Sequence, residues 1–181
     1  MNTPAMLLTA RMRLVPATVE LAQAEIEDRA ALATLLQASI PVSWPPEMLA
    51  DALPFFLRQL EASPHHVGWI TWYGVLRDSG SEPDTLVASS GFMGPPQDGT
   101  VEIGYSVLPE YQRQGLATEM VEGLVGWALA HAAVRRVVAE IHSDNTPSLQ
   151  LVCKLGFAEI GAGSEPGYLR FELGGATNGR T

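Results

Sequence analysis

A glycine-bearing loop between an apolar strand and a helix carries the clearest chemical signal in this chain. Residues 101–118 read VEIGYSVLPEYQRQGLAT, and the apolar run MVEGLVGWALAH follows almost at once. The first backbone N–H groups of a helix have no acceptor within it, and Gly115 lets the backbone approach a ligand closely. The pattern predicts a diphosphate site around Gly115. An ordinary helix start is the plainer interpretation of the same residues.

Composition indicates one folded domain. The chain has 181 residues, of which 46% are hydrophobic and 17% charged, enough for one domain with a substantial core. The net charge of −9 argues against a nucleic-acid partner, because phosphate neutralisation needs clustered Lys and Arg. It is compatible with a basic or amine-bearing acceptor.

Cysteine and histidine content argues against a disulfide or a metal site. Cys153 is the only cysteine, and the pair His65 and His66 lacks a third ligand at metal spacing. We expect Cys153 to be a buried structural thiol and not a nucleophile, because no base lies next to it in the sequence. The N-terminus shows no signal-peptide pattern and no apolar run reaches the length of a membrane helix, so we expect a cytoplasmic protein without membrane association.

Hydrophobic periodicity predicts the elements that must position the loop. We expect an α/β domain over residues 1–173, with a mixed, mostly antiparallel sheet of seven strands and about four helices, followed by a frayed tail at 174–181. The expected strands are residues 7–16, 67–76, 86–93, 101–108, 137–142, 157–160 and 168–173. The expected helices are residues 19–38 in one or two segments, 47–61 bent or split at Pro54, 115–132, and 147–155 capped by Thr146.

Three motifs along the chain resemble those of one family. The first is IGYSVLPEYQRQGLA at residues 103–117, the second is NTPS at 145–148, and the third is KLGF at 154–157. Together, and in this order of elements, they resemble the GNAT N-acetyltransferases, and in particular the branch that contains the ribosomal-protein N-terminal acetyltransferases. The likeness covers roughly residues 7–173 and implies a single-domain GNAT fold.

The resemblance implies acetyl-CoA as co-substrate and no metal. The strand at residues 101–108 would separate from the strand at 137–142, and the backbone of Ser106 and Val107 would hold the pantetheine arm and the thioester carbonyl. Asn145 would add a hydrogen bond to the same arm. The residues expected around the diphosphate are Gln112, Arg113, Gln114, Gly115, Leu116, Ala117 and Thr118.

A carboxylate is the expected general base, since an ammonium ion must lose a proton before it attacks a thioester. Glu102 is the first candidate, because related enzymes often place a glutamate at the start of the cofactor strand; a solvated residue at a strand end is the alternative. Glu140 is the second candidate and His142 the third.

The proton source for the departing thiolate is less directly indicated. Many GNAT enzymes use a tyrosine four residues before the glycine of the last motif, and Val152 stands at that position here. The N-terminal acetyltransferase branch implies Ser148 instead, and Tyr168 is a further option. Helix capping would also explain Asn145 and Ser148.

The acceptor site is expected near Trp44, which lies in a proline-rich loop between the two early helices. Contact with the acceptor and anchoring of the loop are both open for this residue. We expect acetyl transfer to a primary amine, on a protein N-terminus, an amino acid or a small molecule, by direct attack in a ternary complex. The alternative is a non-catalytic acyl-CoA-binding protein. Homodimers are common in the family, so a homodimer is one expected assembly.

Overall fold

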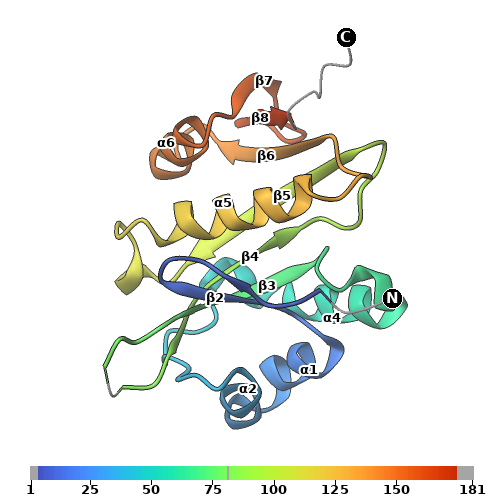
Figure 1. The fold of residues 1–181 in the computed structure, drawn as a ribbon. Helices are drawn as coiled ribbons and strands as arrows, with labels where there is room; N and C mark the ends of the chain where they lie inside the picture. Colours follow the sequence, from blue (N-terminus) through green and yellow to red (C-terminus); the bar gives the residue numbers. More distant parts are fainter. Residues whose placement is uncertain (1–3, 81, 175–181) are drawn as a thin grey trace.

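The computed structural model describes residues 4–80 and 82–174. These residues form one sheet in the strand order β1-β2-β3-β4-β5-β6-β8-β7, with helices on both faces (Figure 1). The strands are β1 (Leu7–Leu8), β2 (Met12–Pro16), β3 (Thr71–Leu76), β4 (Thr85–Phe92), β5 (Thr100–Val107), β6 (Arg136–His142), β7 (Ala158–Ala162) and β8 (Tyr168–Gly174). The α-helices are α1 (Val19–Glu27), α2 (Arg29–Leu36), α3 (Glu47–Ala50), α4 (Leu53–Ala62), α5 (Leu116–Leu129) and α6 (Thr146–Lys154).

Strand direction follows the lengths of the connections. β1 to β5 pair antiparallel in chain order, as short turns require, and β6, β8 and β7 are also antiparallel neighbours. Between these two groups β5 and β6 run parallel, because α5 forms the crossover that joins them. The predicted mixed, mostly antiparallel α/β sheet is therefore confirmed.

The prediction of one strand over residues 7–16 is wrong, and this makes the sheet eight-stranded instead of seven-stranded. A tight turn separates β1 from β2. Thr9 closes it, since its N–H donates to the Met12 carbonyl and its Oγ1 accepts from the Met12 N–H, both at 3.0 Å. The Thr9 side chain thus accepts the hydrogen bond from the Met12 N–H, which closes the turn.

Both early helices are split. Asp28 ends α1 in an extended conformation and caps α2, since its Oδ1 accepts from the N–H groups of Ala30 at 2.9 Å and Ala31 at 3.0 Å. Pro54 lies in the first turn of α4, where a backbone N–H has no acceptor within the helix, so proline loses no hydrogen bond there. The short helix α3 precedes α4. Six α-helices over the described residues therefore replace the four expected.

Two predicted boundaries need correction. Residues 67–70 do not join β3; they follow a 3-10 turn at Pro64–His66, and the Gly68 carbonyl accepts from the Trp72 indole at 2.7 Å. Thr146 does not cap α6. Asn145 does, with its side-chain oxygen 3.2 Å from the Ser148 nitrogen. Asn and Thr are both good caps, and local sequence does not decide between neighbours.

The core has two parts, one on each side of the sheet. On one side α5 and α6 pack on β2 to β6 through residues such as Met120, Leu124 and Val152, all fully buried. On the other, α1, α2 and α4 cover β3 through residues such as Leu32 and Tyr73. Burying a large apolar side chain stabilises a fold by about 1.5–3 kcal/mol. The sheet is thereby packed between two layers of helices, which hold its central strands in place.

The predicted tail begins at Gly174, which the structure assigns to the end of β8; residues 175–181 lie outside the described part of the chain. Within residues 4–80 and 82–174, no helix is both long enough and apolar enough to cross a bilayer.

Candidate active site

The predicted diphosphate loop has the backbone geometry that an anion site needs. After a 3-10 turn at Pro109–Tyr111, Arg113 and Gly115 both adopt left-handed conformations, with φ of 59° and 79°. Gly115 caps α5 without a side-chain bond, and the helix's first backbone bond runs from Glu119 N–H to the Gly115 carbonyl at 3.1 Å. The N–H groups before Glu119 therefore stand at the open end of the helix.

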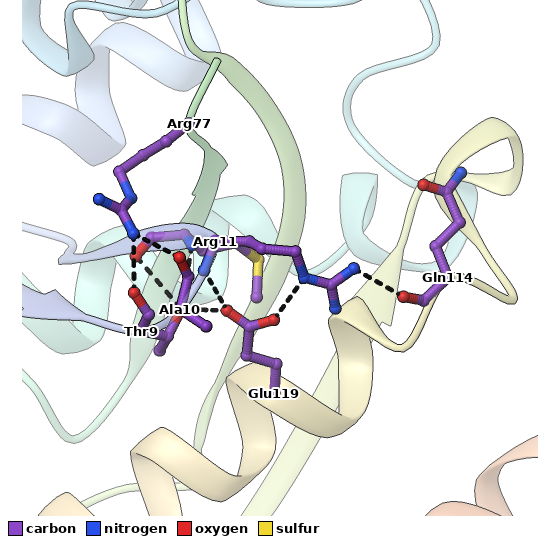
Figure 2. A network of polar contacts seen from close by, with 7 residues as sticks. Thr9, Ala10, Arg11, Arg77, Gln114 and Glu119 are labelled. Atoms are coloured by element: carbon purple, nitrogen blue, oxygen red, sulfur yellow. Dashed lines mark hydrogen bonds and ion pairs between the residues drawn. The ribbon is translucent and has the colours of Figure 1, made fainter. Parts of the chain in front are cut away.

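Arg11 in the turn between β1 and β2 ties this loop to the rest of the fold (Figure 2). Its guanidinium donates to the Glu119 carboxylate at 2.8 Å through Nε and to the Gln114 carbonyl at 2.9 Å through Nη1. Its backbone N–H and the Thr9 hydroxyl both donate to the other Glu119 oxygen at 2.6 Å. Sequence reasoning missed Arg11, because 103 residues separate it from Gln114.

The same network sets the charge state of Glu119. Burial raises the pKa of this carboxyl, but hydrogen bonds from Thr9 and Arg11, with the Arg11 charge, outweigh burial and lower it below its usual value. The Arg77 guanidinium braces the turn from the other side by donating to the carbonyls of Thr9 and Ala10 at 2.9 and 2.6 Å (Figure 2). Glu119 is therefore ionised at physiological pH and can keep its ion pair with Arg11.

The two parallel strands separate directly beside this loop. β5 and β6 pair at Thr100, Val101 and Glu102 only, although both continue for several residues. From Ile103 onward β5 keeps its pairing with β4 and, in the described part of the chain, has no partner toward β6. The separation that the family resemblance implied is therefore present, and it leaves backbone groups facing a gap.

Alternation along β5 decides which backbone groups face the gap. The Leu108 N–H donates to the Val87 carbonyl and the Glu102 carbonyl accepts from the Met93 N–H, so the even-numbered residues of β5 turn their backbone toward β4. Ser106, which pairs with Ser89, belongs to that set. Its odd-numbered neighbours Tyr105 and Val107 turn toward β6 instead.

The Gln112 side chain connects the loop around Gly115 to β5. Its amide nitrogen donates to the Val107 carbonyl at 2.9 Å, which links the diphosphate loop to the end of β5. The Val107 N–H is on the side of the gap. Of the predicted cofactor residues, the structure thus brings Val107 and the loop around Gly115 to one edge of the opening.

Arg170 joins the two carboxylates that the sequence proposed as bases. Its Nη1 lies 2.5 Å from a Glu140 oxygen and 3.4 Å from a Glu102 oxygen. All three side chains project from the sheet face opposite α5, since Glu140 and Arg170 are register partners and Glu102 is paired with Val138, two residues before Glu140. Sequence analysis did not identify Arg170; its only signal was a charged residue alternating within the apolar strand YLRFEL.

The two carboxylates have different protonation behaviour. Burial, followed by the negative charge of Glu140, raises the pKa of Glu102 against the opposing effect of Arg170. Hydrogen bonds from Ser164, whose hydroxyl lies 2.6 Å from the carboxylate, hold the pKa of Glu140 below its usual value. Groups whose pKa values are pushed apart in this way suit different roles. Glu102 can accept a proton, and Glu140 stays ionised.

Two adjoining hollows lie on this face. An apolar cavity of about 300 Å³ is bounded by α3, α4, β3, β4 and the residues Gly104, Tyr105 and Ser106 of β5. A polar recess of about 400 Å³ contains Glu102 and Arg170. Met93 lines both. The unpaired part of β5 is thus flanked by an apolar pocket and by the proposed base.

The start of α6 lies on the opposite face of the sheet. Asn145 accepts from the Ser148 N–H as the helix cap, and the Tyr105 hydroxyl donates to the Ser148 carbonyl at 3.4 Å. Burial raises the pKa of Tyr105, so its hydroxyl keeps its proton. Val152 is fully buried. The Tyr105 hydroxyl thus lies at the Ser148 backbone, and sequence analysis identified only Ser148 of these two hydroxyl-bearing residues.

The other residues singled out from the sequence, Trp44, His142 and Cys153, lie in three different environments. Trp44 is 4% exposed, and its indole N–H donates to Glu25 at 2.9 Å, an arrangement that anchors the loop. His142 is half-exposed and packs edge-on against Tyr168, with ring centroids 5.3 Å apart. The prediction of a buried Cys153 is wrong: it is exposed, because α6 turns Leu151 and Val152 to the core and the next residue outward.

No group of three or more His, Cys, Asp or Glu side chains within residues 4–80 and 82–174 is arranged to hold a metal ion.

The fold and this site together define the class of protein. A mixed sheet opens between two parallel strands beside a glycine loop at a helix start, as in acyl-CoA-dependent acyltransferases. A family model described as the acetyltransferase (GNAT) domain matches residues 18–158. The chain therefore belongs to the GNAT acetyltransferase family.

Relatives and solved structures agree with this assignment. The chain is 31% identical over 115 residues, 63% of its length, to the uncharacterized N-acetyltransferase YjdG of Bacillus subtilis. It spans 66% of that protein and 34% to 49% of three further Bacillus N-acetyltransferases.

Two solved structures share the fold at low identity. The ribosomal-protein-S5-alanine acetyltransferase of Vibrio fischeri has a TM-score of 0.61 at 15% identity, covering 98% of this chain and 100% of that one. RimJ of Mycobacterium smegmatis, solved with CoA-disulfide, has a TM-score of 0.62 at 18% identity, covering 98% of this chain and 91% of that one. At these identities the likeness concerns the fold.

Proposed function

We propose that this protein transfers the acetyl group of acetyl-CoA to a primary amine by direct attack in a ternary complex. The observation that carries the proposal is the separation of β5 from β6 between the Gly115 loop and the Glu102 carboxylate. An acyl thioester placed in this gap would have its diphosphate at the helix start on one side and a base on the other.

The cofactor assignment rests on the loop and on β5. The N–H groups from Arg113 to Thr118 would receive the diphosphate, where each favourable charge at a helix N-terminus contributes about 0.3–1 kcal/mol. The Val107 N–H, free on the side of the gap, would hold the thioester carbonyl in place of the Ser106 backbone, which is paired with β4. Asn145 can still donate through its amide nitrogen while its oxygen caps α6.

In the chemical step Glu102 would take a proton from the acceptor ammonium ion, directly or through water. The neutral nitrogen then attacks the thioester carbonyl carbon, a C–N bond forms, and the C–S bond breaks. The Val107 N–H would stabilise the developing oxyanion. The departing thiolate would be protonated by the Ser148 hydroxyl or by the Tyr105 hydroxyl, and the second proton that the nitrogen loses as it becomes an amide would restore that hydroxyl. Glu140 would stay ionised and orient Arg170.

Thermal unfolding with acetyl-CoA, CoA or ATP in excess tests the cofactor site. Ligand at about 100 times its dissociation constant adds about 2.7 kcal/mol to the free energy of unfolding. We expect both CoA species to raise Tm and ATP to leave it unchanged. No shift with either CoA species would overturn the loop assignment.

Thiol release with a panel of primary amines tests catalysis. We expect turnover in the wild type and at least a hundredfold lower kcat/KM in Glu102→Gln. CoA binding without turnover of any amine would instead favour the non-catalytic acyl-CoA-binding alternative. A cytoplasmic location and a homodimer stay predictions.

A further inference from the structure

The apolar cavity next to β5 has the composition of a binding pocket for one kind of acceptor. Its walls are formed by Leu49 and Phe56 of the α3–α4 region, by Ile70 directly before β3, and by Phe92 and Met93 at the end of β4. None of the described residues that line it carries a charge. The inference below rests on the proposed function, because it names the acceptor for that same site.

Three hydroxyls of the cavity lining have hydrogen-bond partners within the protein. The Thr71 and Ser89 hydroxyls lie 3.2 Å apart, and the Ser90 hydroxyl donates to the Gly104 carbonyl at 2.8 Å. A charged group that entered the cavity would lose its hydration and gain no partner of opposite charge. The cavity therefore favours apolar groups and disfavours carboxylates and phosphates.

Electrostatics at the mouth of the cavity favours a cation. Glu102 is two residues from Gly104 on the same face of β5, about 7 Å along the strand. The Arg170 Nη1 lies between the Glu102 and Glu140 carboxylates, so these three side chains together carry a net charge of −1. Arg136, which lines the same recess, is paired with Glu172 at 3.7 Å. An ammonium group is attracted to this position, and a carboxylate beside it is repelled.

The size of the cavity suits a small apolar group. A volume of about 300 Å³ gives room for one aromatic ring with a short chain. Met93, which is 66% exposed and lines both hollows, lies between the cavity and the base, and its flexible thioether can adapt to a ring.

We propose that the acceptor is a small primary amine that carries one apolar group of about the size of a phenyl ring and no anionic group. The apolar group occupies the cavity bounded by Phe56, Ile70 and Met93. The amine reaches past Met93 to Glu102, where it is deprotonated for attack on the thioester.

Four primary-amine acceptors test the proposal with the 181-residue chain. They are 2-phenylethylamine, phenylalanine, which adds a carboxylate, ethanolamine, which lacks the ring, and a short peptide with an N-terminal phenylalanine. We expect kcat/KM for 2-phenylethylamine to exceed that for each of the others at least tenfold. Equal or better use of any of the other three would overturn the proposal and leave the acetyltransferase assignment intact.

Gly104→Ala locates the effect in the cavity. A Cβ there would meet the Met93 Cε at 3.5 Å, an ordinary contact, so the variant should fold with a smaller cavity. We expect kcat/KM for 2-phenylethylamine to fall at least fivefold relative to that for ethanolamine. Gly126→Ala is the matched control, because its added methyl group lies on the exposed side of α5 and meets no described atom within 4 Å. An unchanged preference in Gly104→Ala would contradict the assignment of the cavity.

Calorimetric binding of 2-phenylethylamine to the protein in excess CoA separates this proposal from the proposed function. Binding that Gly104→Ala weakens, without turnover when acetyl-CoA is supplied, would support the pocket and count against the enzyme mechanism. Absence of binding, whatever the turnover of other amines, would overturn the pocket assignment.

Discussion

Arg11 forms an ion pair with Glu119 at 2.8 Å, and the same guanidinium holds the Gln114 carbonyl of the proposed diphosphate loop at 2.9 Å. A residue in the first turn of the chain thus connects the start of α5 to the loop that precedes it (Figure 2). The Arg11 side chain is 46% exposed, and exposed ion pairs contribute less than about 1 kcal/mol to stability. The consequence should therefore appear in ligand binding more than in unfolding.

Arg11→Ala should weaken CoA binding about three- to tenfold, because the loop loses one fixed hydrogen bond and must be ordered by the ligand. Titration calorimetry with CoA measures this. Arg135→Ala is a suitable control, since that guanidinium also donates to a backbone carbonyl, that of Asp98, away from the loop. A wild-type dissociation constant in Arg11→Ala would show that the loop is held without it.

Glu119 should make stability depend on pH in the acid range. Its pKa is lowered in the folded protein, so its contribution is complete above the unfolded pKa of about 4.3 and is lost as pH falls through the folded value. At pH 7 the Tm of Glu119→Gln should lie below that of the wild type. The difference should shrink as the pH is lowered from 5 toward 3. A constant difference across this range would mean that Glu119 does not titrate as described.

Arg170→Gln should shift the acid limb of the pH profile of kcat/KM to higher pH. Arg170 opposes the rise in the pKa of Glu102 that burial and Glu140 cause, so removing its charge leaves the rise uncompensated. Arg136→Gln is the control, because Arg136 lines the same recess and pairs with Glu172 at 3.7 Å instead. If the acid limb of Arg170→Gln coincides with that of the wild type, Glu102 is not the base or Arg170 does not act on it.

Two glycines of the same region should respond oppositely to alanine. Gly126→Ala should stabilise the protein by about 0.5–1 kcal/mol, because it is an exposed position inside α5. Gly115→Ala should destabilise it by about 1–2 kcal/mol, because φ there is 79°. At this chain length 1 kcal/mol corresponds to a change in Tm of about 2–4 °C, which thermal unfolding resolves. A stabilised Gly115→Ala would show that the loop can relax out of the left-handed conformation.

Local sequence was sufficient to predict much of the fold, including the strand, loop and helix that carry the candidate site. The loop around Gly115 lies within one strand–loop–helix unit, so its position between β5 and α5 could be predicted from the local sequence; the diphosphate site there stays a prediction. The splits at Asp28 and Pro54 were among the alternatives for the same reason, since caps and proline act over one helical turn. The turn at Thr9 and the cap at Asn145 were misassigned, because several neighbouring residues could serve.

Contacts between distant segments were decided only by the tertiary structure. Glu102 meets Arg170 across 68 residues of chain, and Arg11 meets Glu119 across 108. No periodicity relates such positions, because they become neighbours through strand order. The same holds for the gap between β5 and β6 and for the apolar cavity, whose walls come from four separate segments. Sequence by itself determined the family and the loop, since both depend on short-range patterns. The partners of Glu102, the exposure of Cys153 and the shape of the apolar cavity depend on packing, and only the folded chain defines them.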